Sequence, residues 1–174
     1  MEFNDCNEFW RRLGDQVLNI SFNLCDIQEK RLVGILKQLP NLEVLKIEGC
    51  RELFMSGIFD SKKELMMNNV HTLSLANNRY LSDSLFNRIV SLIPKLEKLD
   101  MSGCHISFHR GLYQKFYPGN TLDPSESVLT FHFINQFIER QADKLKVLDF
   151  NNTLIDGNTL IMLSAMTNLK LRVS

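Results

Sequence analysis

Short stretches of alternating apolar and polar residues recur along the chain. Each has apolar residues at positions 1, 4 and 6 and a small or polar residue at position 9, and the stretches start at Val17, Leu42, Val70, Leu96 and Leu145. Because successive residues of a strand point to opposite faces, positions 4 and 6 face one side and positions 3, 5 and 7 the other. We therefore expect five short strands that share one core, and residues 168–174 fit as a sixth strand.

Between these strands the apolar spacing changes to that of helices. Residues 26–29 and 61–64 have the form of a capping box, and Ser82 with Asp83 opens a segment whose Leu85, Ile89 and Leu92 share one face. A further helix is expected over residues 159–166, with Leu160 and Leu163 facing inward. At the start of the chain, Phe9, Trp10 and Leu13 predict the helix of a preceding unit.

The interval between the repeats that start at Leu96 and Leu145 is about twice as long as the others, and no second match lies inside it. We interpret it as one repeat with an insertion. Residues 105–122 are expected to form a loop. Asp123, followed by Pro, Ser and Glu, then predicts a helix that runs to about Ala142.

The spacing of these positions is the leucine-rich-repeat signature, L-x-x-L-x-L-x-x-N/C, with position 9 occupied by Cys25, Cys50, Asn78, Cys104 and Thr153. It predicts an α/β fold: a solenoid, or horseshoe arc, with parallel inner strands and outer helices. We expect residues 1–174 to form a single domain of about five to six repeats, with an inserted loop near residues 105–122. Both ends are expected to be truncated, because the first helix lacks its strand and no capping repeat follows the last strand.

Several short sequence motifs also resemble those of a known family of repeat proteins. Cysteine at position 9, Pro-Lys-Leu-Glu-Lys-Leu at 94–99, Ser-Gly-Cys at 102–104 and Leu-Ser-Asp at 81–83 resemble the cysteine-containing leucine-rich repeats of F-box proteins. The resemblance implies a non-catalytic protein-binding module, the substrate-recognition part of an SCF ubiquitin ligase receptor in ubiquitin-dependent protein degradation. No F-box is found in this chain, so binding of the SCF adaptor is expected only through an F-box that lies elsewhere. The alternative is a structural or scaffolding repeat fragment with no ubiquitin-ligase role.

Charge and composition narrow the choice of partner. Lys and Arg number 20, as do Asp and Glu, so the formal net charge is zero and we expect neither nucleic acid nor membrane as a partner. The start of the chain lacks the basic and apolar regions of a signal peptide, and the four cysteines are too few for a disulfide scaffold. An intracellular location, cytoplasmic or nuclear, is therefore expected.

Residues capable of chemistry are scattered. No complete motif for a nucleophile, a phosphate-binding loop or a dinucleotide site is present, so we expect no enzyme and no cofactor. Cys104, His105 and His109 are the nearest approach to a metal site. Zinc requires four ligands and no further cysteine or histidine cluster completes this set, so no metal is expected.

The remaining hypothesis is a protein-binding face. Positions 5 and 7 of the repeats point away from the core and are small or polar, with Ser74 and Ala76 at the centre of a ladder flanked by charges. The candidate residues are Ser21, Asn23, Lys46, Glu48, Ser74, Ala76, Asp100, Ser102, Asp149 and Asn151. A second set in the inserted loop mixes aromatic and basic side chains, which are common at interfaces; it comprises Phe108, Arg110, Tyr113, Phe116 and Tyr117. The alternative for the loop is that these rings fold back and cover the core of the repeats.

Overall fold

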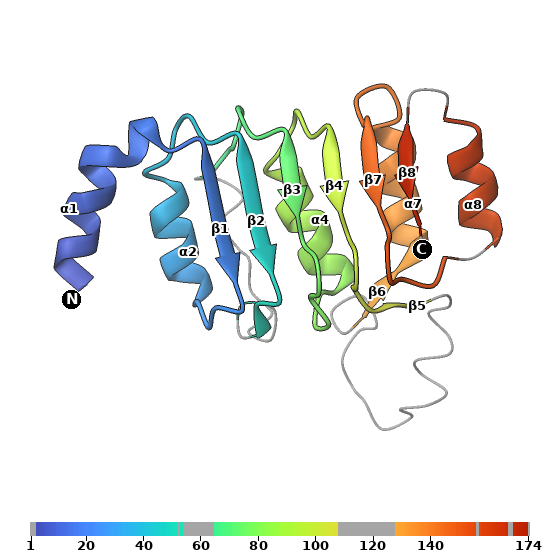
Figure 1. The fold of residues 1–174 in the computed structure, drawn as a ribbon, viewed down its shortest axis with the longest axis horizontal. Helices are drawn as coiled ribbons and strands as arrows, with labels where there is room; N and C mark the ends of the chain where they lie inside the picture. Colours follow the sequence, from blue (N-terminus) through green and yellow to red (C-terminus); the bar gives the residue numbers. More distant parts are fainter. Residues whose placement is uncertain are drawn as a thin grey trace.

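A computed structural model describes residues 3–51, 53, 65–107, 128–155, 157–166 and 169–173. Its main element is a six-stranded parallel sheet whose strands lie side by side in chain order (Figure 1). The strands are β1 (Asn19–Asn23), β2 (Val44–Glu48), β3 (Thr72–Ser74), β4 (Lys98–Asp100), β7 (Val147–Asp149) and β8 (Lys170–Arg172). The expected α/β class and all six expected strands are confirmed.

The first helix precedes the first strand, the other helices follow strands in the chain, and most of them lie behind the sheet in the view of Figure 1. They are α1 (Phe3–Leu13), α2 (Glu29–Leu36), α4 (Asp83–Ser91), α7 (Phe131–Arg140) and α8 (Gly157–Ser164), and the 3-10 turn η1 (Gly14–Gln16) follows α1. Within the described part of the chain, no helix has both the length and the apolar character needed to cross a bilayer.

The core lies between the sheet and these helices. The leucines at position 4 of β2, β3, β4 and β7 are at most 1% exposed; they are Leu45, Leu73, Leu99 and Leu148. Each buried leucine contributes about 1.5–3 kcal/mol from transfer out of water. The helices pack on one another as well, since the Phe86 ring of α4 meets the Phe137 ring of α7 edge to face, with centroids 5.4 Å apart. One apolar cluster therefore runs under the sheet from Phe22 to Leu163.

Two of the expected helix starts can be compared with the structure. Ser82 caps α4, because its side chain accepts a hydrogen bond from the backbone N–H of Leu85. The capping box expected at residues 26–29 is wrong. Helix α2 begins at Glu29, and the residue before it, Gln28, makes no side-chain capping bond. The capping box expected at residues 61–64 lies outside the described residues.

The inserted region departs from expectation on both sides. Ile106–Ser107 form a strand, β5, where a loop was expected, and β5 pairs in parallel with β6 (Leu129–Thr130) in a second, two-stranded sheet. The helix expected from Asp123 to Ala142 is therefore shorter, since α7 begins only after β6. The buried carboxylate of Asp83 explains this start: it accepts hydrogen bonds from the N–H and the hydroxyl of Thr130, which holds that residue extended. Residues 108–127 lie outside the described part.

Helix α8 is rotated relative to the expected inward face. Leu163 is buried, as expected, but Leu160 is 43% exposed and Thr159 is fully buried in its place. The hydroxyl of Thr159 accepts a hydrogen bond from the Asn135 side chain of α7. This bond offsets the cost of burying the hydroxyl group.

Candidate partner-binding face

The sheet surface opposite the core is called the polar face here, and it comprises positions 3, 5 and 7 of the strands. The position 5 residues stand directly opposite one another across all six strands, in the order Ser21, Lys46, Ser74, Asp100, Asp149 and Arg172. Neighbouring strands lie about 4.8 Å apart, so this row forms a continuous line across the sheet. The register thus brings the expected position 5 residues together and adds Arg172.

Asp100 is fixed by its neighbours on this face. Its Oδ1 accepts hydrogen bonds from the Ser102 N–H at 2.9 Å and from the Ser102 hydroxyl at 2.6 Å. Its Oδ2 accepts a third hydrogen bond from the Ser74 hydroxyl at 3.1 Å. The carboxylate is therefore held in one orientation by groups of its own sheet. Three of its acceptor sites are already used within the protein.

Asp149 stands beside Asp100 on the next strand and has partners of its own. Its Oδ1 accepts the N–H of Asn151 at 3.0 Å, and its Oδ2 lies 3.6 Å from a guanidinium nitrogen of Arg172. Arg172, whose side chain is mostly exposed, partly offsets the charge of the adjacent pair of carboxylates.

The position 7 residues continue the face toward the carboxyl ends of the strands. Asn23 and Glu48 are paired in register, and Ala76, Ser102 and Asn151 occupy position 7 just beyond the ends of β3, β4 and β7. Although positions 5 and 7 point away from the core, Ser74 and Ala76 are only 4% and 5% exposed. They are small residues between longer side chains, so their neighbours shield them.

The amino ends of the strands carry charges that sequence reasoning missed. The Lys146 ammonium lies 2.8 Å from a Glu97 carboxylate oxygen, and the pKa of Glu97 is lowered chiefly by this hydrogen bond. One strand pair away, a ring nitrogen of His71 lies 3.8 Å from a carboxylate oxygen of Glu43. These four residues occupy position 2 of their repeats, just before the strands. The strand register is needed to show that they lie close to one another.

Position 9 forms a second ladder, inside the turn that follows each strand. In three repeats the position 9 side chain donates to the position 6 carbonyl of the preceding repeat: Cys50 Sγ to Phe22 O, Asn78 Nδ2 to Ile47 O, and Cys104 Sγ to Leu75 O. Burial raises the pKa of Cys50, and that of Cys104 to about 12, so both thiols stay protonated and act as donors. This role explains why either cysteine or asparagine can occupy the position in these three repeats.

Position 8 is the third recurring feature of the turns. Its residue has positive φ in each of the five repeats: Leu24, Gly49, Asn77, Gly103 and Asn152. Glycine and asparagine tolerate this conformation, whereas leucine does so at a cost of about 1–2 kcal/mol. The Leu24 side chain is 80% exposed and lies against Gly49, where an added Cβ would approach it to 2.7 Å.

The other candidates from the sequence have no role on this face. Among the described residues, no three histidine, cysteine, aspartate or glutamate side chains gather as metal ligands would. The thiol of Cys104 is directed to a backbone carbonyl, His105 is exposed, and His109 lies outside the described residues. The loop candidates also lie outside them; these are Phe108, Arg110, Tyr113, Phe116 and Tyr117.

Comparison with known proteins adds no relative. A scan against protein-family models finds no matching family, and a search of curated proteins finds no matching sequence.

Proposed function

We propose that this chain is a non-catalytic protein-binding module built as a leucine-rich-repeat solenoid. We further propose that it resembles the substrate-recognition part of an SCF ubiquitin ligase receptor of the F-box type and acts inside the cell, in the cytoplasm or nucleus. The repeat phrases at 81–83, 94–99 and 102–104 support this proposal. Three features of the structure support it too: the parallel strands in chain order, the hydrogen bonds of position 9 and the recurrent positive φ at position 8.

The observation that carries the binding role is the in-register polar row across the sheet. This row has no bulky apolar groups, and it has Lys46 near one end and carboxylates toward the other. An extended partner segment could therefore lie along it and meet charges of both signs. Charges of this kind steer and orient a partner more than they hold it. Recruitment of the SCF adaptor remains assigned to an F-box, which this chain does not display.

A scaffolding role is the second candidate, and the last strand favours it. Strand β8 forms the end of the sheet, and Leu171 and Val173 are 37% and 47% exposed. An open strand edge with apolar neighbours can pair with a further repeat. In this case the chain would extend a longer sheet and the polar face would hold no partner.

Charge reversal on the polar face distinguishes the two roles. Lys46→Glu changes an exposed side chain of the row, and Lys30→Glu makes the same charge change on an exposed position of α2. The full-length parent protein with each substitution would be affinity-purified from cells, and its partners would be quantified by mass spectrometry. A binding role requires that Lys46→Glu weaken capture of a specific partner by about 1–2 kcal/mol, or roughly tenfold, while Lys30→Glu does not.

The scaffolding role expects no difference between the two variants. Both proteins must show the thermal unfolding of the parent before the comparison counts. Asp100 is unsuitable for the same test, because its reversal would also break the hydrogen bonds with Ser74 and Ser102. Ala76→Trp is unsuitable for a related reason, since Ala76 is buried.

A further inference from the structure

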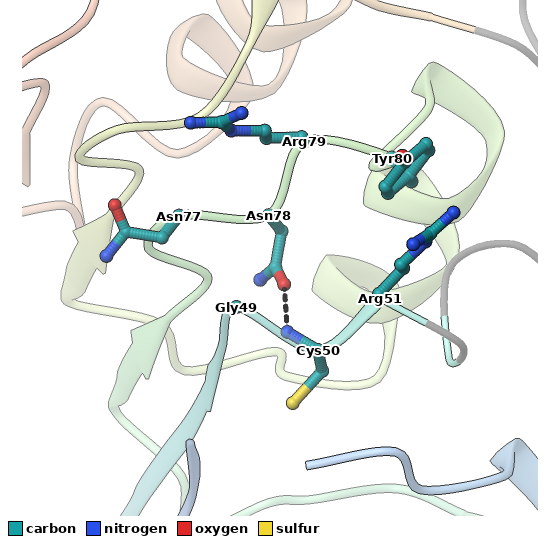
Figure 2. Close-up of a pocket in the computed structure, with 7 residues that line it drawn as sticks. All are labelled: Gly49, Cys50, Arg51, Asn77, Asn78, Arg79 and Tyr80. Carbon is teal, nitrogen blue, oxygen red and sulfur yellow. Dashed lines mark hydrogen bonds between the residues drawn. The ribbon is translucent and has the colours of Figure 1, made fainter. Parts of the chain in front are cut away.

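A small pocket lies where two neighbouring repeats leave the sheet. Its volume is about 130 Å³, and it lies between the turn after β2, residues 49–51, and the turn after β3, residues 77–80 (Figure 2). This is room for several water-sized groups. The lining includes Arg51, Arg79 and Tyr80, and none of its residues is acidic. A cavity with cationic and amide groups and no carboxylate of its own is suited to an anion.

The backbone of the turn after β3 supplies candidate donors for this pocket. At Cys104 the position 9 backbone N–H donates to the carbonyl of Met101, three residues earlier, at 3.2 Å. At Asn78 the corresponding carbonyl, that of Leu75, instead receives the side-chain Nδ2 at 2.8 Å. No acceptor for the Asn78 backbone N–H is found among the described residues. This N–H is therefore a candidate donor at the turn.

The next two residues continue the series of donors. In the described part of the chain, the backbone N–H groups of Arg79 and Tyr80 also lack an acceptor, and both residues are exposed. Three consecutive N–H groups after a residue with positive φ, here Asn77, provide the donors from which backbone anion sites are built.

One guanidinium group borders the pocket in a defined position. The Arg51 guanidinium carbon lies over the Tyr80 ring, 5.4 Å from its centroid, and this cation–π contact limits the freedom of an exposed side chain. Figure 2 shows Arg79 extending on the other side of the turn, away from Arg51. The side chains therefore place one positive charge, not two, beside the pocket. No ion-pair partner of Arg51 is found among the described residues.

We propose that this pocket binds a carboxylate of a peptide partner. A carboxylate has one charge and two acceptor oxygens, which match one guanidinium fork and adjacent backbone N–H groups. The assignment to a partner rests on the proposed function: Ala76, on the polar face, directly precedes Asn77, and its carbonyl accepts the N–H of Gly49 at the pocket wall. A segment crossing the polar face over β3 leads to the pocket. The carboxylate belongs to an acidic side chain or to the chain terminus of this segment.

The binding of small carboxylates to the isolated chain tests the site without any partner. Backbone amide signals would be followed by NMR during titration with sodium propionate, which represents an acidic side chain, and with N-acetylglycinate, which represents a chain terminus. Ionic strength would be held constant with sodium chloride. Saturable shifts centred on Asn78, Arg79 and Tyr80, with millimolar affinity, are expected for at least one of the two. The tighter ligand identifies the source of the carboxylate.

Two substitutions locate the interaction. Arg51→Gln is expected to weaken binding about tenfold through loss of a charge-assisted pair. Arg11→Gln, which removes an exposed arginine from α1, is the matched control and should leave the affinity unchanged.

Three results would overturn the proposal. The first is the absence of saturable shifts at residues 78–80 with either carboxylate. The second is an equal loss of affinity in Arg11→Gln and Arg51→Gln, which would indicate a general charge effect. The third is inorganic phosphate that binds the same amides more than tenfold tighter than both carboxylates, which would assign the pocket to a different anion. None of these results depends on whether the polar face binds a partner.

Discussion

Replacing Asn78 with alanine tests whether position 9 holds neighbouring repeats together. The Asn78 side chain is 2% exposed and makes three hydrogen bonds. Its Oδ1 accepts the Cys50 N–H at 2.9 Å, and its Nδ2 donates to the carbonyls of Ile47 at 2.6 Å and Leu75 at 2.8 Å. Two of these bonds reach the turn and the strand of the preceding repeat, so one side chain joins β2 to β3.

The cost follows from the groups that lose a partner. In Asn78→Ala the N–H of Cys50 and the carbonyl of Ile47 lose the amide group in a buried place, and each such group costs about 1–3 kcal/mol. The Leu75 carbonyl is spared, because it keeps the Cys104 thiol and can accept the freed Asn78 N–H. We expect a loss of about 3–4 kcal/mol in the free energy of unfolding, a large part of the stability of an ordinary domain.

Urea denaturation followed by circular dichroism measures this loss from the midpoint and slope. Asn78→Cys should cost only about 1–2 kcal/mol, because a thiol can donate to Ile47 as Cys104 does to Leu75 but cannot accept from Cys50. Asn19→Ala, on an exposed position of β1, should change stability by less than about 0.5 kcal/mol. Equal losses in Asn78→Ala and Asn19→Ala would refute the role given to position 9.

Three further predictions concern single groups. Burial raises the pKa of Cys104 to about 12, so its thiolate is scarce at pH 8; iodoacetamide should label half-exposed Cys25 much faster in the folded chain, as peptide mass mapping would show. Lys146→Met should raise the pKa of Glu97 toward its ordinary value in an NMR titration; because this pKa is lowered in the folded chain, any stabilisation is present above the unfolded pKa and lost as pH falls. Leu24→Asn should raise the urea midpoint, by about 0.5–1 kcal/mol in stability, because asparagine tolerates φ near +51°.

The strands could be located from the sequence because their signal is short and local. Positions 4 and 6 are apolar in every repeat, and the side chains at 45, 73, 99 and 148 are buried as this alternation requires. In a repeat fold each strand pairs with its neighbour in the chain, so locating the strands also gives their order. The long interval before Leu145 did not disturb this order, since β4 pairs directly with β7.

The helices were harder because their inward face is chosen by partners that the sequence does not name. Leucine at position 160 looked like a core residue, yet Thr159 turns inward to meet Asn135 on α7. The start of α7 is set by the buried carboxylate of Asp83, 47 residues earlier, and not by the local Asp-Pro-Ser-Glu phrase. Long-range polar contacts of this kind override local capping signals.

The polar face was predictable in its membership but not in its chemistry. Alternation places positions 5 and 7 on one side, whereas the shielding of Ser74 and the fixed orientation of Asp100 depend on neighbours from other repeats. The pocket was not predictable at all. Arg51 and Tyr80 lie beyond position 9, and no sequence pattern displays the contact between them.

The hydrogen bonds of the face also indicate which of its charges are available to a partner. Asp100 and Asp149 are both engaged by groups of their own sheet. By contrast, Lys46 is exposed and, within the described part of the chain, has no ion-pair partner; the same holds for Arg51, five residues later on the same repeat. A charge already satisfied inside the protein gains little from a ligand, whereas an unpaired one gains the full new contact. Lys98 on β4 and Lys170 on β8 are also exposed lysines of this face without an ion-pair partner among the described residues, so the available positive charge is spread from β2 to β8 although the whole chain is neutral. This distribution favours an acidic partner segment that crosses the sheet, and it implies that Lys98→Glu should weaken binding as Lys46→Glu does.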